Sequence, residues 1–133
     1  MGKAAAGSGD KLSVSSASSN THVLTTSSST ETHQCDFTVT ISAAGSANVF
    51  IGGIAAAIDN GQSESNGTHP TLDSLTGSWS PLLGKTGKIK GGSNTVSING
   101  NPAVRHDDPA DCCSFNGTVV VQNASTSTVL IGD

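Results

Sequence analysis

Short stretches in which apolar and polar residues alternate recur along this 133-residue chain. Residues 45–58 superpose on residues 92–105, and an apolar residue at every second position in each predicts a half-buried β-strand. Gly52-Gly53 and Asn99-Gly100 follow the two strands, and such pairs supply the positive φ angles of a tight hairpin turn. The matched apolar positions are Val49 with Val96 and Ile51 with Ile98.

Both halves of this repeat occur a third time, at opposite ends of the chain. Residues 126–133 copy the first half, with Val129 and Ile131 at the apolar positions. Residues 4–10 match residues 102–108, which form the small-residue second half of the repeat. The chain therefore contains three repeats, and the third is split between the termini, so we expect the two ends to pair.

Three long connections, at about residues 11–44, 62–91 and 109–124, separate the repeats. The first is rich in Ser and Thr, the second is punctuated by Gly and Pro, and none shows sustained helical periodicity. The length is that of one domain, residues 1–133. The pattern predicts an all-β domain with long loops.

The composition offers little material for a hydrophobic core. Three Phe and one Trp are the only aromatic residues, and hydrophobic residues make up 34% of the chain. Large buried side chains contribute about 1.5–3 kcal/mol each, so a core this poor predicts an additional fastening by a metal, a disulfide or a partner. Three cysteines without a secretory signal favour a metal or a free thiol over a disulfide framework.

Charge and patterning exclude several classes of function. A net charge of −4 gives no basic surface for nucleic acid. No apolar run reaches the length of a membrane span, and the N-terminus lacks the apolar segment of a secretory signal. Catalysis needs convergent side chains in a walled pocket, and an extended chain of small residues does not supply one. We therefore expect no enzymatic activity.

The offset triple repeat resembles the PAAR-repeat proteins, which form the tips of contractile injection machines such as type VI secretion systems and phage tails. The resemblance rests on Pro102-Ala103-Val104-Arg105 with Asp108, on residues 4–10, on the three alternating strands and on the terminal residues 129–133. The middle copy departs from the pattern, with Ile58 at the arginine position and Gly61 at the aspartate position.

The resemblance implies a small cone with pseudo-threefold symmetry whose base caps a trimeric β-helical spike protein, one tip per trimer. Such a tip sharpens the spike and contacts a target membrane only transiently. It would be assembled in the cytoplasm without a signal peptide and leave the cell as part of the particle. The residues that would meet the spike are Val49, Ile51, Val96, Ile98, Val129 and Ile131.

The family binds a metal ion near its vertex, usually zinc, through three histidines and one cysteine. The resemblance implies a site formed by all three loops, and we expect the ligands His22, His33, His69 and Cys112. Cys35 is an alternative to His33, because alternate residues of a strand share one face. Cys113 is an alternative to Cys112, and iron is an alternative to zinc.

A second function is compatible with the same sequence. A free-standing β-domain that binds a metal or adheres to carbohydrate would use the Ser/Thr-rich loops for recognition. Only a spike tip should bind a trimeric β-helix at a ratio of one to three.

Overall fold

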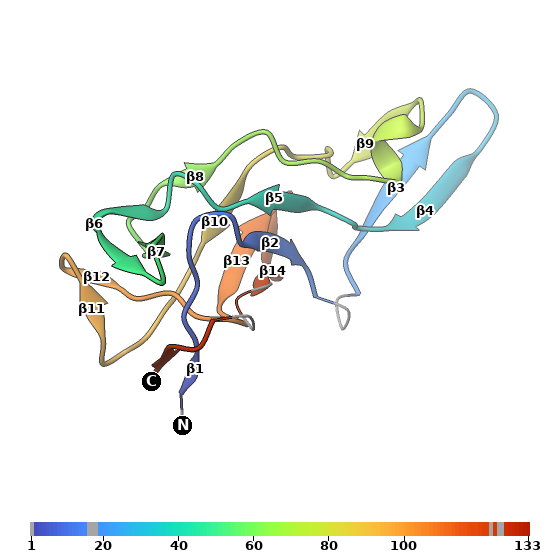
Figure 1. The fold of residues 1–133 in the computed structure, drawn as a ribbon. Coiled ribbons are helices and arrows are strands. Elements are labelled where there is room, and N and C mark those ends of the chain that lie inside the picture. Colours follow the sequence, from blue (N-terminus) through green and yellow to red (C-terminus); the bar gives the residue numbers. More distant parts are fainter. Residues whose placement is uncertain (1, 16–18, 123, 125–126) are drawn as a thin grey trace.

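The computed structural model describes residues 2–15, 19–122, 124 and 127–133, and short β-strands dominate it (Figure 1). Three two-stranded antiparallel sheets gather at the end of the molecule where both termini lie. Their strands are β6 (Gly45–Ile51) with β7 (Ile54–Ala57), β11 (Ser97–Ile98) with β12 (Asn101–Pro102), and β1 (Lys3–Ala4) with β15 (Leu130–Ile131). The pairing of β1 with β15 joins the two ends of the chain, as the split third repeat predicts.

The two predicted hairpin turns have the backbone conformation that their residues suggest. Gly52 and Gly53 have φ angles of 61° and 81°, and Asn99 and Gly100 have φ angles of 53° and 81°. Two consecutive positive φ angles are the signature of the turn whose twist matches that of the flanking strands.

The three repeats meet in a closed ring of backbone hydrogen bonds. The amide of Ala6 donates to Val104 (3.0 Å), the amide of Val104 donates to Ala57 (3.0 Å), and the amide of Ala57 donates to Ala6 (2.9 Å). Each repeat thus gives one bond and receives one. The ring explains why these positions hold small residues, since the three strands approach closely there, and it gives the domain its pseudo-threefold axis.

The connections between the repeats form more structure than the sequence predicts. A six-stranded antiparallel sheet consists, in spatial order, of β5 (Thr38–Thr40), β2 (Lys11–Val14), β14 (Phe115–Gln122), β13 (Pro109–Cys112), β10 (Gly87–Ile89) and β8 (Ser63–Glu64). At the end opposite the termini, β4 (Thr30–Gln34), β3 (Thr21–Thr25) and β9 (Ser78–Ser80) form a three-stranded sheet, with the 3₁₀ turn η1 (Leu72–Ser74) beside it. The all-β class is confirmed.

The larger hydrophobic core lies on the six-stranded sheet. Among its fully buried members are Leu12, Phe37, Ile41, Val119 and Val121. A smaller cluster lies between the three hairpins, where Ile131 packs with Ala5 and Ala103 and the half-buried Ile51 and Ile98 lie against them. None of the helical residues that the structure describes forms a helix long and apolar enough to cross a membrane.

Glu64 organises the chain that leads into β6. Its side chain is only 2% exposed, and its carboxylate accepts hydrogen bonds from the amides of Ser42 (2.9 Å), Ala43 (2.8 Å) and Ala44 (2.8 Å). Asp10 and Asp108 each accept a backbone amide in the other two repeats. The middle repeat has Gly61 instead, and its Ile58 amide donates to the carbonyl of Ala44, in the segment that Glu64 holds.

Replacing Glu64 by glutamine should lower the free energy of unfolding by about 1–3 kcal/mol, because the new amide group turns a donor toward a buried N–H. Urea denaturation of the purified variant measures the change. Glu31→Gln is the matched control, since Glu31 is an exposed residue of β4 and its change should cost less than about 0.5 kcal/mol. Equal denaturation midpoints for Glu64→Gln and Glu31→Gln would contradict the capping role.

Candidate metal centre

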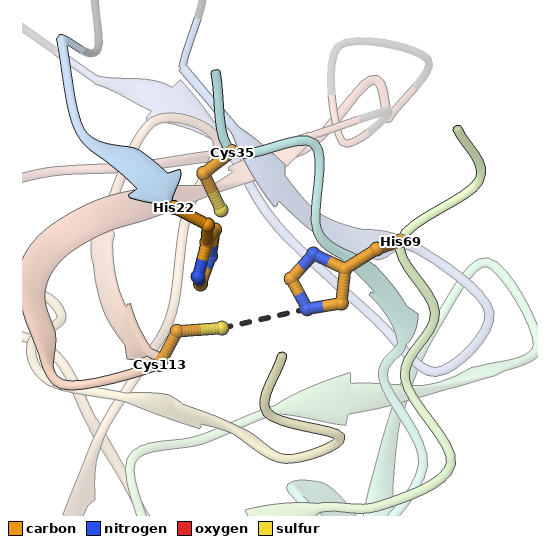
Figure 2. Close-up of side chains that lie close together, drawn as sticks. All are labelled: His22, Cys35, His69 and Cys113. Atoms are coloured by element: carbon orange, nitrogen blue, oxygen red, sulfur yellow. Dashed lines mark hydrogen bonds between the residues drawn. The ribbon is translucent and has the colours of Figure 1, made fainter. Parts of the chain in front are cut away.

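Four side chains from separate segments converge between the two larger sheets. His22 lies on β3, Cys35 directly follows β4, His69 precedes η1, and Cys113 lies in the turn between β13 and β14. One nitrogen or sulfur of each lies within 4.8 Å of those of the other three (Figure 2). This group, here called the His₂Cys₂ cluster, could hold a metal ion.

The spacing of these atoms is close to that of a four-coordinate zinc site. Tetrahedral bonds of 2.0–2.3 Å place ligand atoms about 3.3–3.8 Å apart. The candidate ligand atoms of the cluster lie within 4.8 Å of one another. A movement of about 1 Å in the most distant pair would bring the whole cluster to the spacing of zinc ligands.

The cluster is enclosed by protein. His22 is 0% exposed, His69 is 1% exposed and Cys35 is 3% exposed, while Cys113 is half-buried. The ring of Phe115 packs against His22 with its centroid at 5.3 Å, and Phe37 packs against His69 at 5.4 Å. An apolar surrounding of this kind limits the access of water to a metal and strengthens its bonds to charged ligands.

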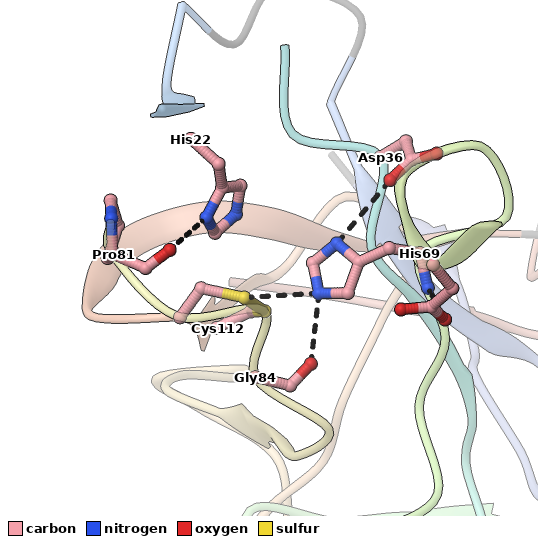
Figure 3. Close-up of a disulfide and its surroundings, with 8 residues drawn as sticks. His22, Asp36, His69, Pro81, Gly84 and Cys112 are labelled. Carbon is pink, nitrogen blue, oxygen red and sulfur yellow. Dashed lines mark hydrogen bonds and ion pairs between the residues drawn. A yellow bond between two sulfur atoms is a disulfide. The ribbon is translucent and has the colours of Figure 1, made fainter. Parts of the chain in front are cut away.

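Backbone carbonyls fix one nitrogen of each imidazole. Nδ1 of His22 lies 2.6 Å from the oxygen of Pro81, and Nε2 of His69 lies 2.9 Å from the oxygen of Gly84 (Figure 3). Because a carbonyl only accepts hydrogen bonds, each of these nitrogens must carry the proton. The other two nitrogens, Nε2 of His22 and Nδ1 of His69, are buried and have no hydrogen-bond partner among the described residues.

Such an arrangement is what a histidine ligand of a metal requires. A metal-binding imidazole donates its remote N–H to a neighbouring acceptor and presents a lone pair with the opposite nitrogen. A buried polar atom without a partner costs free energy, and a bound cation would remove that cost at both unpartnered nitrogens. The residues present therefore fit a metal ion.

The pKa shifts of His22 and Cys35 bear on metal binding, because a metal ion and protons compete for the same ligand atoms. Burial lowers the pKa of His22, and the nearby His69 lowers it further, against the opposing effects of the Pro81 carbonyl and Asp36. Burial raises the pKa of the Cys35 thiol, and Asp36 adds to this, against a backbone hydrogen bond from Phe37. His22 is thus held as a neutral ligand, whereas Cys35 must lose a proton when a metal binds.

Cys113 also has a second possible partner. It is joined to its neighbour Cys112 by a disulfide, and Cys112 belongs to the main hydrophobic core. The thiolate is the form of cysteine that binds metals, so Cys113 can serve as a ligand only when this disulfide is reduced.

Comparison with known proteins places the chain in a family. The family model described as the PAAR motif matches residues 40–122, which is more than half of the chain. The chain belongs to the PAAR motif family. No curated protein and no solved structure matches it significantly.

Membership in the PAAR family supports a role at the spike tip of a contractile injection system, in association with spike proteins. Proteins of this family are structural components of the machine. Two members of the His₂Cys₂ cluster, His69 and Cys113, lie inside the matched residues, whereas His22 and Cys35 precede them.

The structure brings together part of the ligand set expected from the PAAR resemblance. His22 and His69 lie in the cluster, and their companions are Cys35 and Cys113, the two alternatives. Cys112, from the expected set, lies outside the cluster with its side chain in the core. His33 also lies outside it.

His33 stands opposite His22 in the register of β3 and β4, but farther from the interior. Its Nε2 lies 2.9 Å from a carboxylate oxygen of Glu31, and its ring packs against Trp79 at 5.7 Å. The spacing His33-Gln34-Cys35 was the signal for Cys35 in the sequence, because both side chains of such a pair can face the same way.

Proposed function

We propose that this PAAR protein is a non-enzymatic spike tip that caps the end of a trimeric β-helical spike, one copy per trimer. The observation that carries the proposal is the ring of backbone hydrogen bonds that sets three hairpins around one axis. A three-chain β-helix ends in three equivalent strand edges that need to be covered, and a single chain with three similar hairpins can cover them by strand addition.

Apolar residues at the hairpin end support this docking role. Phe50 is 59% exposed, and Ile54, on the other strand of the same hairpin, is also exposed. A cleft between this hairpin and the C-terminal segment is lined by Ile51, Ile54 and Val129. We propose that the spike covers this end through the predicted positions together with other exposed apolar residues of the hairpins. The complete set is Val49, Ile51, Val96, Ile98 and Val129, with Phe50, Ile54 and Leu130, while Ile131, which is 7% exposed, would support them from beneath.

We propose that the His₂Cys₂ cluster binds zinc. Two thiolates and two neutral imidazoles balance the charge of Zn²⁺, and mixed sulfur and nitrogen ligands in a tetrahedral arrangement are typical of structural zinc sites. Iron is the alternative. The ion would fasten β3, the segment after β4, the segment before η1 and the turn after β13, so its binding free energy would contribute to folding.

The mechanical role follows from this arrangement. The hairpin end would rest on the spike, and the opposite end, made rigid by the metal, would meet the target membrane when the machine contracts. The protein would be assembled in the producing cell and leave it as part of the particle.

Docking can be tested with the trimeric β-helical spike protein encoded by the same genome. Size-exclusion chromatography with light scattering should give one tip per three spike chains. Phe50→Asp should weaken binding at least about 30-fold, since truncating an interface hot spot costs 2 kcal/mol or more.

Leu82→Asp is the control, because Leu82 is exposed but follows β9 at the other end of the molecule. It should leave binding to the spike unchanged. A wild-type protein that binds no spike would favour the free-standing metal-binding or adhesive domain.

A further inference from the structure

Asp36 carries a carboxylate that lies beside the His₂Cys₂ cluster but is not one of its four members. It follows Cys35 directly, and its Oδ2 accepts a hydrogen bond from the amide of Thr71 at 2.7 Å. Its Oδ1 lies 3.4 Å from Nδ1 of His69 and has no hydrogen-bond partner among the described residues (Figure 3).

The contact between Asp36 and His69 joins two acceptors. Nε2 of His69 carries the ring proton that the carbonyl of Gly84 accepts, so Nδ1 of the neutral ring presents a lone pair. A carboxylate oxygen presents lone pairs as well. Two such atoms at 3.4 Å are stabilised only when a positive charge, a proton or a metal cation, lies with them.

Asp36 differs from the cluster residues in its access to solvent. Its side chain is 28% exposed, whereas that of His69 is 1% exposed. It lines a shallow surface groove together with Cys35, Phe37 and Pro70. A cation in solution can therefore reach the exposed part of Asp36 before it reaches the buried Oδ1 of the same side chain or the buried side chains of His69 and Cys35.

We infer that Asp36 is the first ligand met by an incoming divalent cation, which it passes to His69 Nδ1 and so into the cluster. This inference rests on the proposed metal centre. The carboxylate holds the partly hydrated ion at the groove, Nδ1 then replaces one of its waters, and the thiols of Cys35 and Cys113 release their protons to water as they bind. Asp36 thus sets the rate of loading, and the four residues of the His₂Cys₂ cluster set the affinity.

Stopped-flow measurement of Co²⁺ uptake by the reduced full-length protein tests this role, because cobalt bound to thiolates absorbs visible and near-ultraviolet light. Asp36→Asn keeps an acceptor for the Thr71 amide and should slow uptake about tenfold or more, the range of electrostatic capture effects. The amount bound and the final spectrum should match those of the wild type. Asp36→Glu, which restores a carboxylate, should recover part of the rate.

Asp59→Asn controls for the loss of one negative charge, since Asp59 lies on the connection after β7, away from the four ligand segments in the chain. It should load as fast as the wild type. Equal rates for Asp36→Asn and the wild type, or equal slowing in Asp59→Asn, would overturn the inference while leaving the metal centre in place.

A slower rate accompanied by a changed cobalt spectrum would also overturn it, because Asp36 would then be a permanent ligand. A wild-type protein that takes up no metal would instead refute the metal centre itself. Asp36→Ser replaces Asp36→Asn if the latter does not fold.

Discussion

Replacing Cys113 by serine is expected to remove the metal from the reduced protein. The change deletes one of the four candidate ligands from a cluster in which one nitrogen of each histidine has no hydrogen-bond partner among the described residues. Structural zinc contributes about 10–16 kcal/mol of apparent free energy in small zinc domains, so the loss of one ligand removes a large part of the stability of the loops. The metal content, measured by elemental mass spectrometry, should fall from about one metal ion per chain to none.

The same variant should unfold at a lower temperature. A loss of a few kcal/mol lowers the melting temperature of a domain of this size by about 10 °C or more. Addition of a chelator should lower the melting temperature of the wild type and leave that of Cys113→Ser unchanged, because the variant holds no metal to lose.

Cys112→Ser is the matched control, since it changes the neighbouring cysteine and leaves the cluster complete. This variant should keep its metal. It should also keep it without a thiol reductant, because the disulfide that competes for Cys113 can no longer form. The opposite result, with metal lost in Cys112→Ser and kept in Cys113→Ser, would return Cys112 to the ligand set and contradict the geometry of the cluster.

The three hairpins could be predicted from the sequence because their information is local. Alternation over a few residues followed by Gly52-Gly53 or Asn99-Gly100 specifies a strand and its turn within one short segment. The pairing of β1 with β15 is not local, but the repeat predicts it. The N-terminus carries only the second half of a repeat and the C-terminus only the first half, so the two must pair to complete a hairpin.

The six-stranded sheet could not be predicted in the same way. Its strands β2 and β14 pair residues 11–14 with residues 119–122, and no repeat or turn links the two segments. Pairing at that separation is decided by which apolar side chains share a core, and Leu12 finds its neighbours among residues of several distant strands. A segment that pairs only through such contacts carries no local signal that identifies its partner.

The His₂Cys₂ cluster could be predicted as a meeting of histidines and cysteines from the loops, but its four members could not be chosen from the sequence. His33 and Cys35 can face the same side, and the difference between them is burial: Cys35, just after β4, is buried, whereas His33, on β4, is partly exposed. Cys112 and Cys113 are adjacent, and the tight turn at Cys113, with φ of 58°, determines which sulfur meets His69. Which residue of each pair joins the cluster therefore depends on the backbone conformation of the folded protein.

Arg105→Ala is expected to destabilise the domain by about 3–5 kcal/mol, because it leaves a buried carboxylate without its partner. The guanidinium of Arg105 donates to both oxygens of Asp108, at 3.1 Å from Nε and 2.9 Å from Nη2, and Asp108 is buried. These hydrogen bonds raise the pKa of Arg105 above its already high ordinary value, so the guanidinium keeps its charge. Equilibrium denaturation in urea measures the loss.

The position of Arg105 adds a second consequence. Its Nη1 donates to the carbonyl of Gly132 at 2.9 Å, so the same side chain ties the C-terminal strand to the middle of the chain. Removal of Arg105 should therefore loosen the pairing of β15 with β1 before the rest unfolds, and amide exchange should show this as faster exchange at Ile131.

Three further variants distinguish the loss of this ion pair from a general loss of packing. Arg105→Lys keeps the charge but loses the planar two-point contact with the carboxylate, so its cost should lie between those of the wild type and Arg105→Ala. Arg105→Ala combined with Asp108→Ala removes the stranded charge and should recover part of the stability of the single variant, as expected for groups in direct contact. Lys90→Ala should change stability by less than about 1 kcal/mol, because Lys90 and Asp111 form an exposed ion pair at 3.5 Å. A double variant as unstable as the sum of its single variants would show that Arg105 acts through packing alone and that the carboxylate of Asp108 is stabilised by its backbone contact with residue 105.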